Sequence, residues 1–157
     1  MTGRIFTLST CLVAVVTACA TAAALTHQDE TAINAATQAY SNAWLTNQAD
    51  AVLATLTPGA VLMPSGMEAV VGADNIRNFW WPPDGSGTTV KVMTQVVDEI
   101  TGEGDMAVVR GHGTLRFVTS TSGRDESHYQ RSTFVNVLRR QPTGKWLIAL
   151  RMWSDLK

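Results

Sequence analysis

Apolar positions in the first third of the chain recur every three or four residues, whereas the second half is rich in β-branched residues. Residues 27–46 contain no Gly or Pro, and their apolar stripe predicts an amphipathic helix. The stripe consists of Ile33, Ala36, Tyr40, Ala43, Trp44 and Asn47. Asp50 is placed to cap a second helix over residues 51–56, which Pro58-Gly59 ends.

The remaining pattern predicts short strands, one more helix and then long strands. Residues 60–63 and 68–71 are short apolar runs, and Gly72 to Trp81 predicts a third helix stopped by two prolines. Long β-rich segments separated by turns follow, at residues 88–100, 106–118, 128–140 and 145–153. Helices grouped before antiparallel strands indicate an α+β domain.

The N-terminal segment has the pattern of a secretory signal. Arg4 precedes a charge-free apolar stretch, and small residues follow up to Ala24. The stretch is shorter than the roughly 20 apolar residues that a membrane-spanning helix needs. We therefore expect residues 1–24 to be a targeting segment and residues 25–157 to form a single domain, exported to the periplasm or the extracellular space.

Two cleavage sites in this segment are compatible with the sequence. Val16-Thr17-Ala18-Cys19 resembles a bacterial lipobox, in which Cys19 carries a lipid and attaches the protein to a membrane. The alternative is ordinary cleavage after Ala24. Because Cys11 and Cys19 both lie in the segment, the mature domain can form no internal disulfide and no Cys-based metal site.

The composition narrows the functional classes. A chain of 157 residues with 45% hydrophobic and 16% charged residues fits one globular domain. Twelve Lys and Arg balance thirteen Asp and Glu to a net charge of −1, which gives no electrostatic basis for binding nucleic acid. Neither a metal-ligand spacing nor a phosphate-binding Gly loop is found, so we predict no metal and no cofactor.

The order of these elements resembles the nuclear transport factor 2-like superfamily, and within it the small bacterial SnoaL-like group that includes ketosteroid isomerase relatives. The resemblance is carried by residues 50–56, 60–64, 72–80, 104–111, 144–148 and 153–155. It implies a cone-shaped, curved antiparallel sheet packed on three N-terminal helices. It also implies an enclosed apolar pocket and a homodimer formed through the outer sheet face.

The resemblance places an oxyanion-binding pair at Tyr40 and Asn136, both able to donate hydrogen bonds. The position of the general base falls at Leu62 or Met63, and neither side chain can accept a proton. The alternative is that Tyr40 is a core aromatic residue and Asn136 a structural hydrogen-bonding group.

Further pocket candidates come from the strand pattern. Arg110 and His112 share one strand face, so they either line the cavity, where they could bind an anion and transfer a proton, or lie on the outer surface. Arg151 and Trp153 share a face of the last strand, and the resemblance places them among the residues that line the cavity. Trp44, Met63 and Trp80 complete the candidate pocket. Arg151 would need a partner there, and the candidates are Glu68 and Asp155. Trp80 and the adjacent Trp81 are not expected to face the core together.

The fold implied by the resemblance hosts many activities, so three functions stay open. The first is a module that binds a small hydrophobic or weakly anionic ligand. The second is an isomerase, cyclase or hydrolase acting on a hydrophobic substrate with Tyr40, Asn136 and His112 as catalytic candidates. The third is a structural or assembly domain whose cavity is filled by its own side chains.

Overall fold

The computed structural model describes residues 23–121 and 123–156. Most of the predicted targeting segment, including Cys11 and Cys19, lies outside the described residues. No helix within the described ranges is long and apolar enough to cross a membrane.

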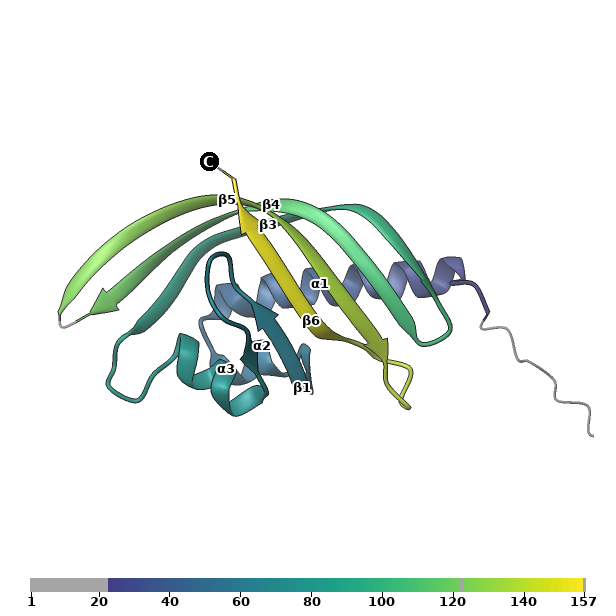
Figure 1. Ribbon diagram of the computed structural model, residues 1–157, viewed down its shortest axis with the longest axis horizontal. Helices are drawn as coiled ribbons and strands as arrows, with labels where there is room; N and C mark the ends of the chain where they lie inside the picture. The colour runs from purple at the N-terminus through teal and green to yellow at the C-terminus, as the bar shows by residue number, and fades with distance from the viewer. Residues whose placement is uncertain (1–22, 122, 157) are drawn as a thin grey trace, which may run out of the picture.

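Six strands form one curved sheet that arches over the helices (Figure 1). The strands are β1 (Leu56–Met63), β2 (Val70–Val71), β3 (Gly87–Glu103), β4 (Met106–Thr121), β5 (Arg124–Arg140) and β6 (Trp146–Asp155). Their order across the sheet is β2-β1-β6-β5-β4-β3. The predicted curved sheet and α+β class are confirmed, but the sheet is mixed, because β1 runs parallel to β6. Just before β1 begins, the Thr55 carbonyl accepts a backbone hydrogen bond from the N–H of Ile148 in β6.

Three helices, α1 (His27–Thr46), α2 (Ala49–Leu53) and α3 (Ala73–Trp80), lie on the concave side of the sheet. The bounds of α1 match the prediction. The prediction that Asp50 caps the second helix is wrong: the cap residue is Gln48, and the Asp50 carboxylate pairs with Arg77 instead. Pro58 and Gly59 lie inside β1 and end no helix, because the chain is already extended at Leu56.

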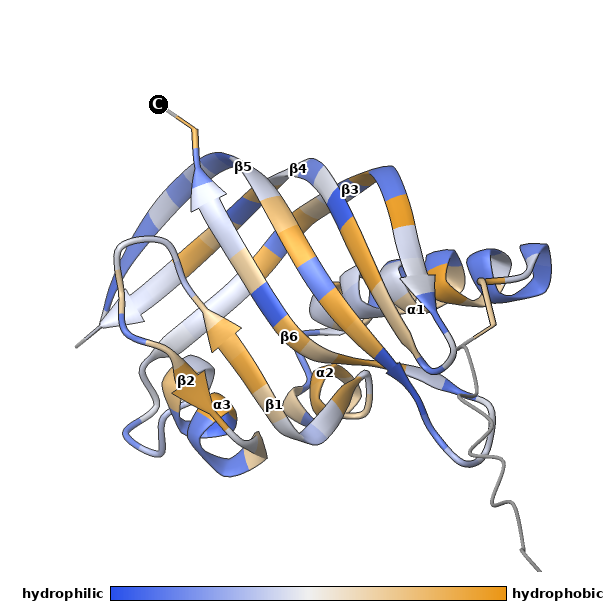
Figure 2. Cartoon of the chain, turned by 45° about the vertical axis from the view of Figure 1, so that its right-hand side comes forward, coloured by the Kyte–Doolittle hydropathy of each residue, from blue (hydrophilic) through white to orange (hydrophobic). Residues whose placement is uncertain are grey.

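The core lies between α1 and the concave face of the sheet. Along β4 and β5 apolar and polar residues alternate (Figure 2), so that Val109, Phe134 and Leu138 are buried while their neighbours point outward. From α1, Ile33 and Trp44 pack into the same core. This face of the sheet therefore determines which side chains can reach an internal cavity.

Strand curvature depends on bulges and on close packing at Gly111. The pairing of β3 with β4 shifts register between Val90 and Val92 and again between Val97 and Glu99. A Cβ atom on Gly111 would lie 2.6 Å from Cζ of Phe134. The glycine thus lets the Phe134 ring lie directly on the strand.

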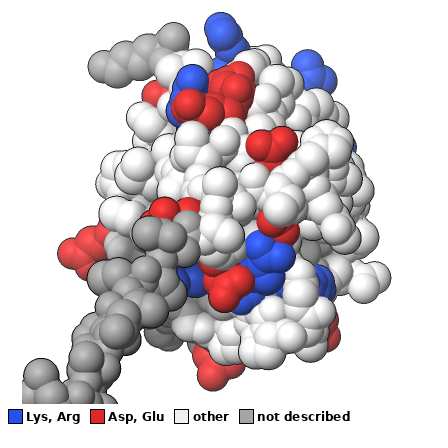
Figure 3. Space-filling view, turned by 90° about the vertical axis from the view of Figure 1, so that its right-hand side faces the viewer, with Lys and Arg blue, Asp and Glu red and all other residues white. Residues whose placement is uncertain are grey.

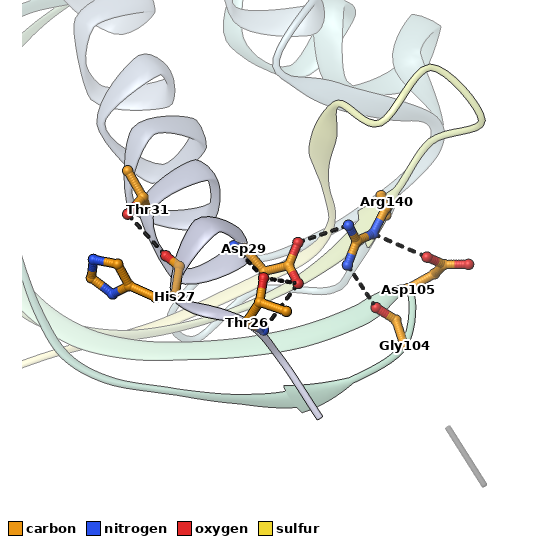
Figure 4. A network of polar contacts seen from close by, with 7 residues as sticks. All are labelled: Thr26, His27, Asp29, Thr31, Gly104, Asp105 and Arg140. Atoms are coloured by element: carbon orange, nitrogen blue, oxygen red, sulfur yellow. Dashed lines mark hydrogen bonds and ion pairs between the residues drawn. The ribbon is translucent and has the colours of Figure 1, made fainter. Parts of the chain in front are cut away.

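The beginning of α1 is tied to the sheet by a network of polar contacts (Figure 4). Thr26 and Asp29 form a capping box, with the Thr26 hydroxyl donating to Asp29 Oδ2 at 2.8 Å. Arg140 of β5 pairs with Asp29 at 2.7 Å and donates to the Gly104 carbonyl at 3.1 Å. Figure 3 shows this end of the molecule, where acidic and basic side chains lie beside one another among uncharged ones.

Candidate functional site

A cavity of about 260 Å³ lies between α1, α3 and the concave face of strands β3 to β6. Its wall is mainly aromatic and aliphatic, with contributions from Tyr40, Trp44, Trp80, Leu115, Phe134 and Trp153. The volume is near the lower end of the range for small-molecule sites, which run from about 300 to 1,000 Å³. An apolar wall with few polar groups is typical of such sites.

The aromatic part of the wall is centred on Trp44 of α1. Trp80 meets it edge-on at 5.2 Å between ring centroids, and Trp81 stacks on it at 5.0 Å. The prediction that Trp80 and Trp81 cannot both face the core is therefore wrong. The helix ends at Trp80, and the non-helical backbone of Trp81 turns its ring back toward Trp44.

Arg151 is the cation of this site. It projects from β6 into the wall of the cavity, yet only 5% of the residue is exposed. Its Nη1 donates a hydrogen bond of 2.8 Å to Asn136 Oδ1 on the neighbouring strand. The prediction that Glu68 or Asp155 pairs with Arg151 is wrong, since no carboxylate within residues 23–121 and 123–156 forms an ion pair with it. Asp155 lies four residues along the same strand face, about 13 Å away at the rise of a β-strand.

Gln95 of β3 is the second partner of Arg151. In the amide orientation that satisfies both ends of the side chain, its oxygen accepts from Arg151 Nη2 at 2.7 Å and Nη1 at 3.2 Å. Its nitrogen then donates to Ser41 Oγ at 3.2 Å. Sequence reasoning missed Gln95, although its place between Met93 and Val97 in a strand with alternating burial could have identified it.

Aromatic rings surround the guanidinium group of Arg151. Its Cζ lies 4.7 Å from the ring centre of Phe134, 4.9 Å from that of Tyr40 and 5.9 Å from that of Trp153. These contacts offset part of the free energy of removing the charge from water. Burial still lowers the pKa of Arg151 from its ordinary value and raises the pKa of the Tyr40 hydroxyl.

Two other polar atoms of the cavity residues are buried without a hydrogen-bond partner among the described residues. They are Nε1 of Trp80, a donor, and Oδ1 of Asp155, an acceptor. Native structures satisfy most buried polar groups, so unsatisfied atoms in a cavity wall are candidates for contacts with a bound molecule.

Five of the predicted pocket residues line the cavity: Tyr40, Trp44, Trp80, Arg151 and Trp153. Asn136 is fully buried and lies behind Arg151, outside the cavity wall. Its Oδ1 accepts from Arg151, and its Nδ2 has no partner among the described residues. Asn136 therefore positions Arg151.

Met63, Arg110 and His112 lie outside the cavity, in contrast to their prediction as pocket residues. Met63 is 38% exposed beside Met152, because Leu62 occupies the buried side of β1. Arg110 pairs with Glu99 at 2.6 Å, and His112 contacts Asp98 at 2.9 Å, all on the outer face of β3 and β4. The alternating side of β4, with Val109 and Leu115, is the one turned inward.

At the position of the general base in the ketosteroid isomerase relatives, this chain has no proton acceptor. Leu62 is buried in the core, and Met63 faces outward. Within the described ranges, no group of three His, Cys, Asp or Glu side chains is placed to hold a metal ion.

Comparisons with known proteins agree with this geometry. A ketosteroid isomerase-like protein from Erwinia carotovora atroseptica is 25% identical, with a TM-score of 0.71 over 84% of this chain and 99% of that chain. An NTF2-like protein with a cystatin-like fold from Novosphingobium aromaticivorans is 22% identical, with a TM-score of 0.57 over 83% of each chain. A cystatin-like protein of unknown function from Nostoc punctiforme is 18% identical, with a TM-score of 0.58 over 84% of this chain and 94% of that chain.

The last two similarities show the fold alone, and no curated protein matches the chain. The model of the SnoaL-like domain family matches residues 37–147. This range includes the cavity-lining part of α1, the helices α2 and α3, and strands β1 to β5. The predicted resemblance is thereby confirmed, and the chain belongs to the SnoaL-like domain family.

Proposed function

We propose that this protein is an exported domain that binds a small, largely apolar molecule in the cavity beneath the curved sheet. The observation that carries the proposal is the cavity itself. Trp44 and Trp153, which could have filled it, form its wall, and about 260 Å³ stays open between them and the sheet. An open volume of this size favours ligand binding over a purely structural role, because an unfilled cavity lowers stability.

The test is native mass spectrometry of the mature domain purified from its source, followed by calorimetric titration of whatever small molecule is retained. Met93→Trp, which places a large ring in the cavity wall, should abolish binding. The neighbouring Val92→Trp changes a 41% exposed position and should leave binding intact. A protein that retains nothing, and binds none of the apolar probes described below, would contradict the proposal.

An enzyme acting on such a molecule is a second candidate, and Asp155 is the observation that favours it. Its carboxylate lines the cavity and has one buried oxygen without a partner among the described residues, so a proton acceptor is present although the β1 position has none. Tyr40 lies in the same wall. If the retained molecule is a substrate, the wild-type domain should convert it and Asp155→Asn should not, whereas neither protein should change a molecule that is only a ligand.

Export with lipidation at Cys19 is also part of the proposal. Residues just after Cys19 support the earlier cleavage site: the Ala23 carbonyl accepts from Gly104 N at 2.7 Å, and Ala24 pairs with Glu103. Cleavage after Ala24 would remove these contacts, whereas cleavage before Cys19 retains them. Cys19→Ala should release the protein from membranes, and a variant that stays membrane-bound would exclude the lipid anchor.

We further propose that the domain forms a homodimer through the outer face of the sheet. Exposed apolar side chains gather there, namely Val92, Val96, Tyr129 and Met152. Arg110 and Glu99 pair within the chain on this face, so these two charges are already compensated before a second copy binds. Val96→Glu should shift the sedimentation coefficient of the purified domain to that of a monomer.

A further inference from the structure

The charge balance of the cavity specifies the ligand more closely. Arg151 is 5% exposed, and both of its side-chain partners, Asn136 and Gln95, are neutral amides. A buried cation without an anion is costly, and proteins normally pair such a charge. The ligand-free domain therefore holds one positive charge in an apolar wall, and no carboxylate of the described residues forms an ion pair with it.

The hydrogen bonds of Arg151 leave a defined edge of its guanidinium group free. Arginine has five N–H donors. Asn136 uses one on Nη1, and the Gln95 oxygen bridges the remaining Nη1–H and one Nη2–H. The Nε–H and the second Nη2–H have no hydrogen-bond partner within residues 23–121 and 123–156. These two donors point in parallel from the same edge, which is the arrangement that donates hydrogen bonds to both oxygens of a carboxylate.

Other groups in the wall limit the charge of the ligand to one. Arg151 is the single Lys or Arg residue among those that line the cavity, whereas Asp155 contributes a carboxylate to the same wall. A dianion such as a phosphate monoester would keep an unbalanced negative charge beside the single guanidinium group. The rings of Trp44, Trp80 and Trp153 require the rest of the ligand to be apolar.

From this arrangement we infer that the cavity takes a small apolar monocarboxylate, with a single ring or a short alkyl chain, whose carboxylate binds the free edge of Arg151. Gln95 and Asn136 then act as positioning residues, because they fix the plane of the guanidinium group without neutralising it. The inference rests on the proposed binding function and goes further by naming the chemical class that the site selects.

The test compares acids with their amides, which have nearly the same shape but no charge. Binding of 3-phenylpropionate and 3-phenylpropanamide, and of hexanoate and hexanamide, is measured by calorimetry on the wild-type domain. We expect each acid to bind at least tenfold more tightly than its amide. Arg151→Gln should reduce this preference to about onefold, whereas Arg110→Gln, which alters an exposed arginine on the outer face, should leave it unchanged.

The outcomes separate this inference from the proposed function. If acid and amide bind equally well, or if Arg151→Gln retains the preference, the carboxylate assignment is wrong while ligand binding stands. If neither member of either pair binds, the carboxylate assignment is wrong, and if the purified domain also retains no small molecule, both proposals are overturned. The acid–amide comparison on the wild-type domain decides the question even if Arg151→Gln does not fold.

Discussion

Arg151 and Asn136 face one another directly across strands β6 and β5, and the Arg151 guanidinium donates a hydrogen bond of 2.8 Å to the Asn136 amide oxygen. An aspartate at position 136 would have almost the same shape and would neutralise the arginine. The amide instead keeps the charge in place and uncompensated. This cross-strand pair is therefore the element that couples the stability of the domain to the selectivity of its cavity.

Asn136→Asp tests that coupling. The new carboxylate would compensate the buried charge, so we expect the free energy of unfolding of the ligand-free domain to rise by about 1 kcal/mol or more. Affinity for 3-phenylpropionate should fall at least tenfold, because Arg151 would no longer need an external anion. Asn136→Ala is the matched control, and the loss of a buried acceptor should destabilise the domain by about 1–3 kcal/mol. Urea denaturation and calorimetry measure the two effects, and a drop in stability for Asn136→Asp would contradict the argument.

Gly111→Ala should disturb the part of the cavity wall that surrounds Arg151. The added Cβ would clash with the backbone oxygen of Val96 and would lie 2.6 Å from Cζ of Phe134, whose ring packs 4.7 Å from the Arg151 guanidinium carbon. Overpacking of this kind costs about 1–3 kcal/mol, and the displaced ring should also weaken ligand binding. Gly59→Ala is the control, since nothing lies within 4 Å of its Cβ position, and it should change stability by less than about 0.5 kcal/mol. Equal urea midpoints for the two variants would show that the strand relaxes around the methyl group.

Sequence patterns were sufficient to predict those elements whose structure depends only on residues that are near one another in the chain. The first helix begins and ends as predicted, from His27 to Thr46, because an apolar stripe without Gly or Pro is a local signal. The region after it was misread. Pro58 and Gly59 have the composition of a helix stop, but contacts of Leu56 with β6, nearly a hundred residues later, make the segment a strand.

The candidate site shows that local sequence patterns do not predict contacts between distant segments. Tyr40 and Arg151 were predicted as cavity residues from the resemblance to the family, whereas the partners of Arg151 were not predicted, because they depend on which strands are adjacent. Gln95 reaches Arg151 from β3, across two intervening strands, through the curvature of the sheet. For Arg110 and His112 the face of the strand could not be decided from alternation alone, since Gly111 and Gly113 interrupt the inward apolar row.

Asn47 should be a stability determinant at the end of α1. Its backbone is left-handed, with φ of 55°, and its side chain bridges both backbone groups of Val90, accepting from the N–H at 2.6 Å and donating to the carbonyl at 3.0 Å. Asn47→Ala loses both bonds and places a Cβ-bearing residue without a polar side chain in that conformation, so we expect a loss of about 3 kcal/mol. Asn47→Gly loses the bonds alone, about 2 kcal/mol. Thermal denaturation measures the order of stability of the two variants and the wild type. An Asn47→Ala variant as stable as the wild type would contradict the proposed role of Asn47 in stability.

The Asp29–Arg140 contact should make stability depend on pH in the acid range. The hydrogen bond from Arg140, followed by those from Thr26, lowers the pKa of Asp29 from 3.8 to about 2. A carboxyl group whose pKa is lower in the folded state contributes stability above the unfolded pKa and loses it as the pH falls toward the folded pKa. Asp29→Asn should therefore be less stable than the wild type at neutral pH, and the difference should shrink as the pH falls from 3.8 to about 2.

Asp105→Asn is the matched control for that pH dependence. Asp105 pairs with the same arginine at 3.0 Å, but its side chain is 78% exposed against 11% for Asp29, so solvent screens the pair. Urea midpoints measured across the acid range should follow the wild type for Asp105→Asn and diverge from it for Asp29→Asn above about pH 4. A constant difference between Asp29→Asn and the wild type at every pH would contradict the prediction, because it would mean that folding does not change the pKa of Asp29.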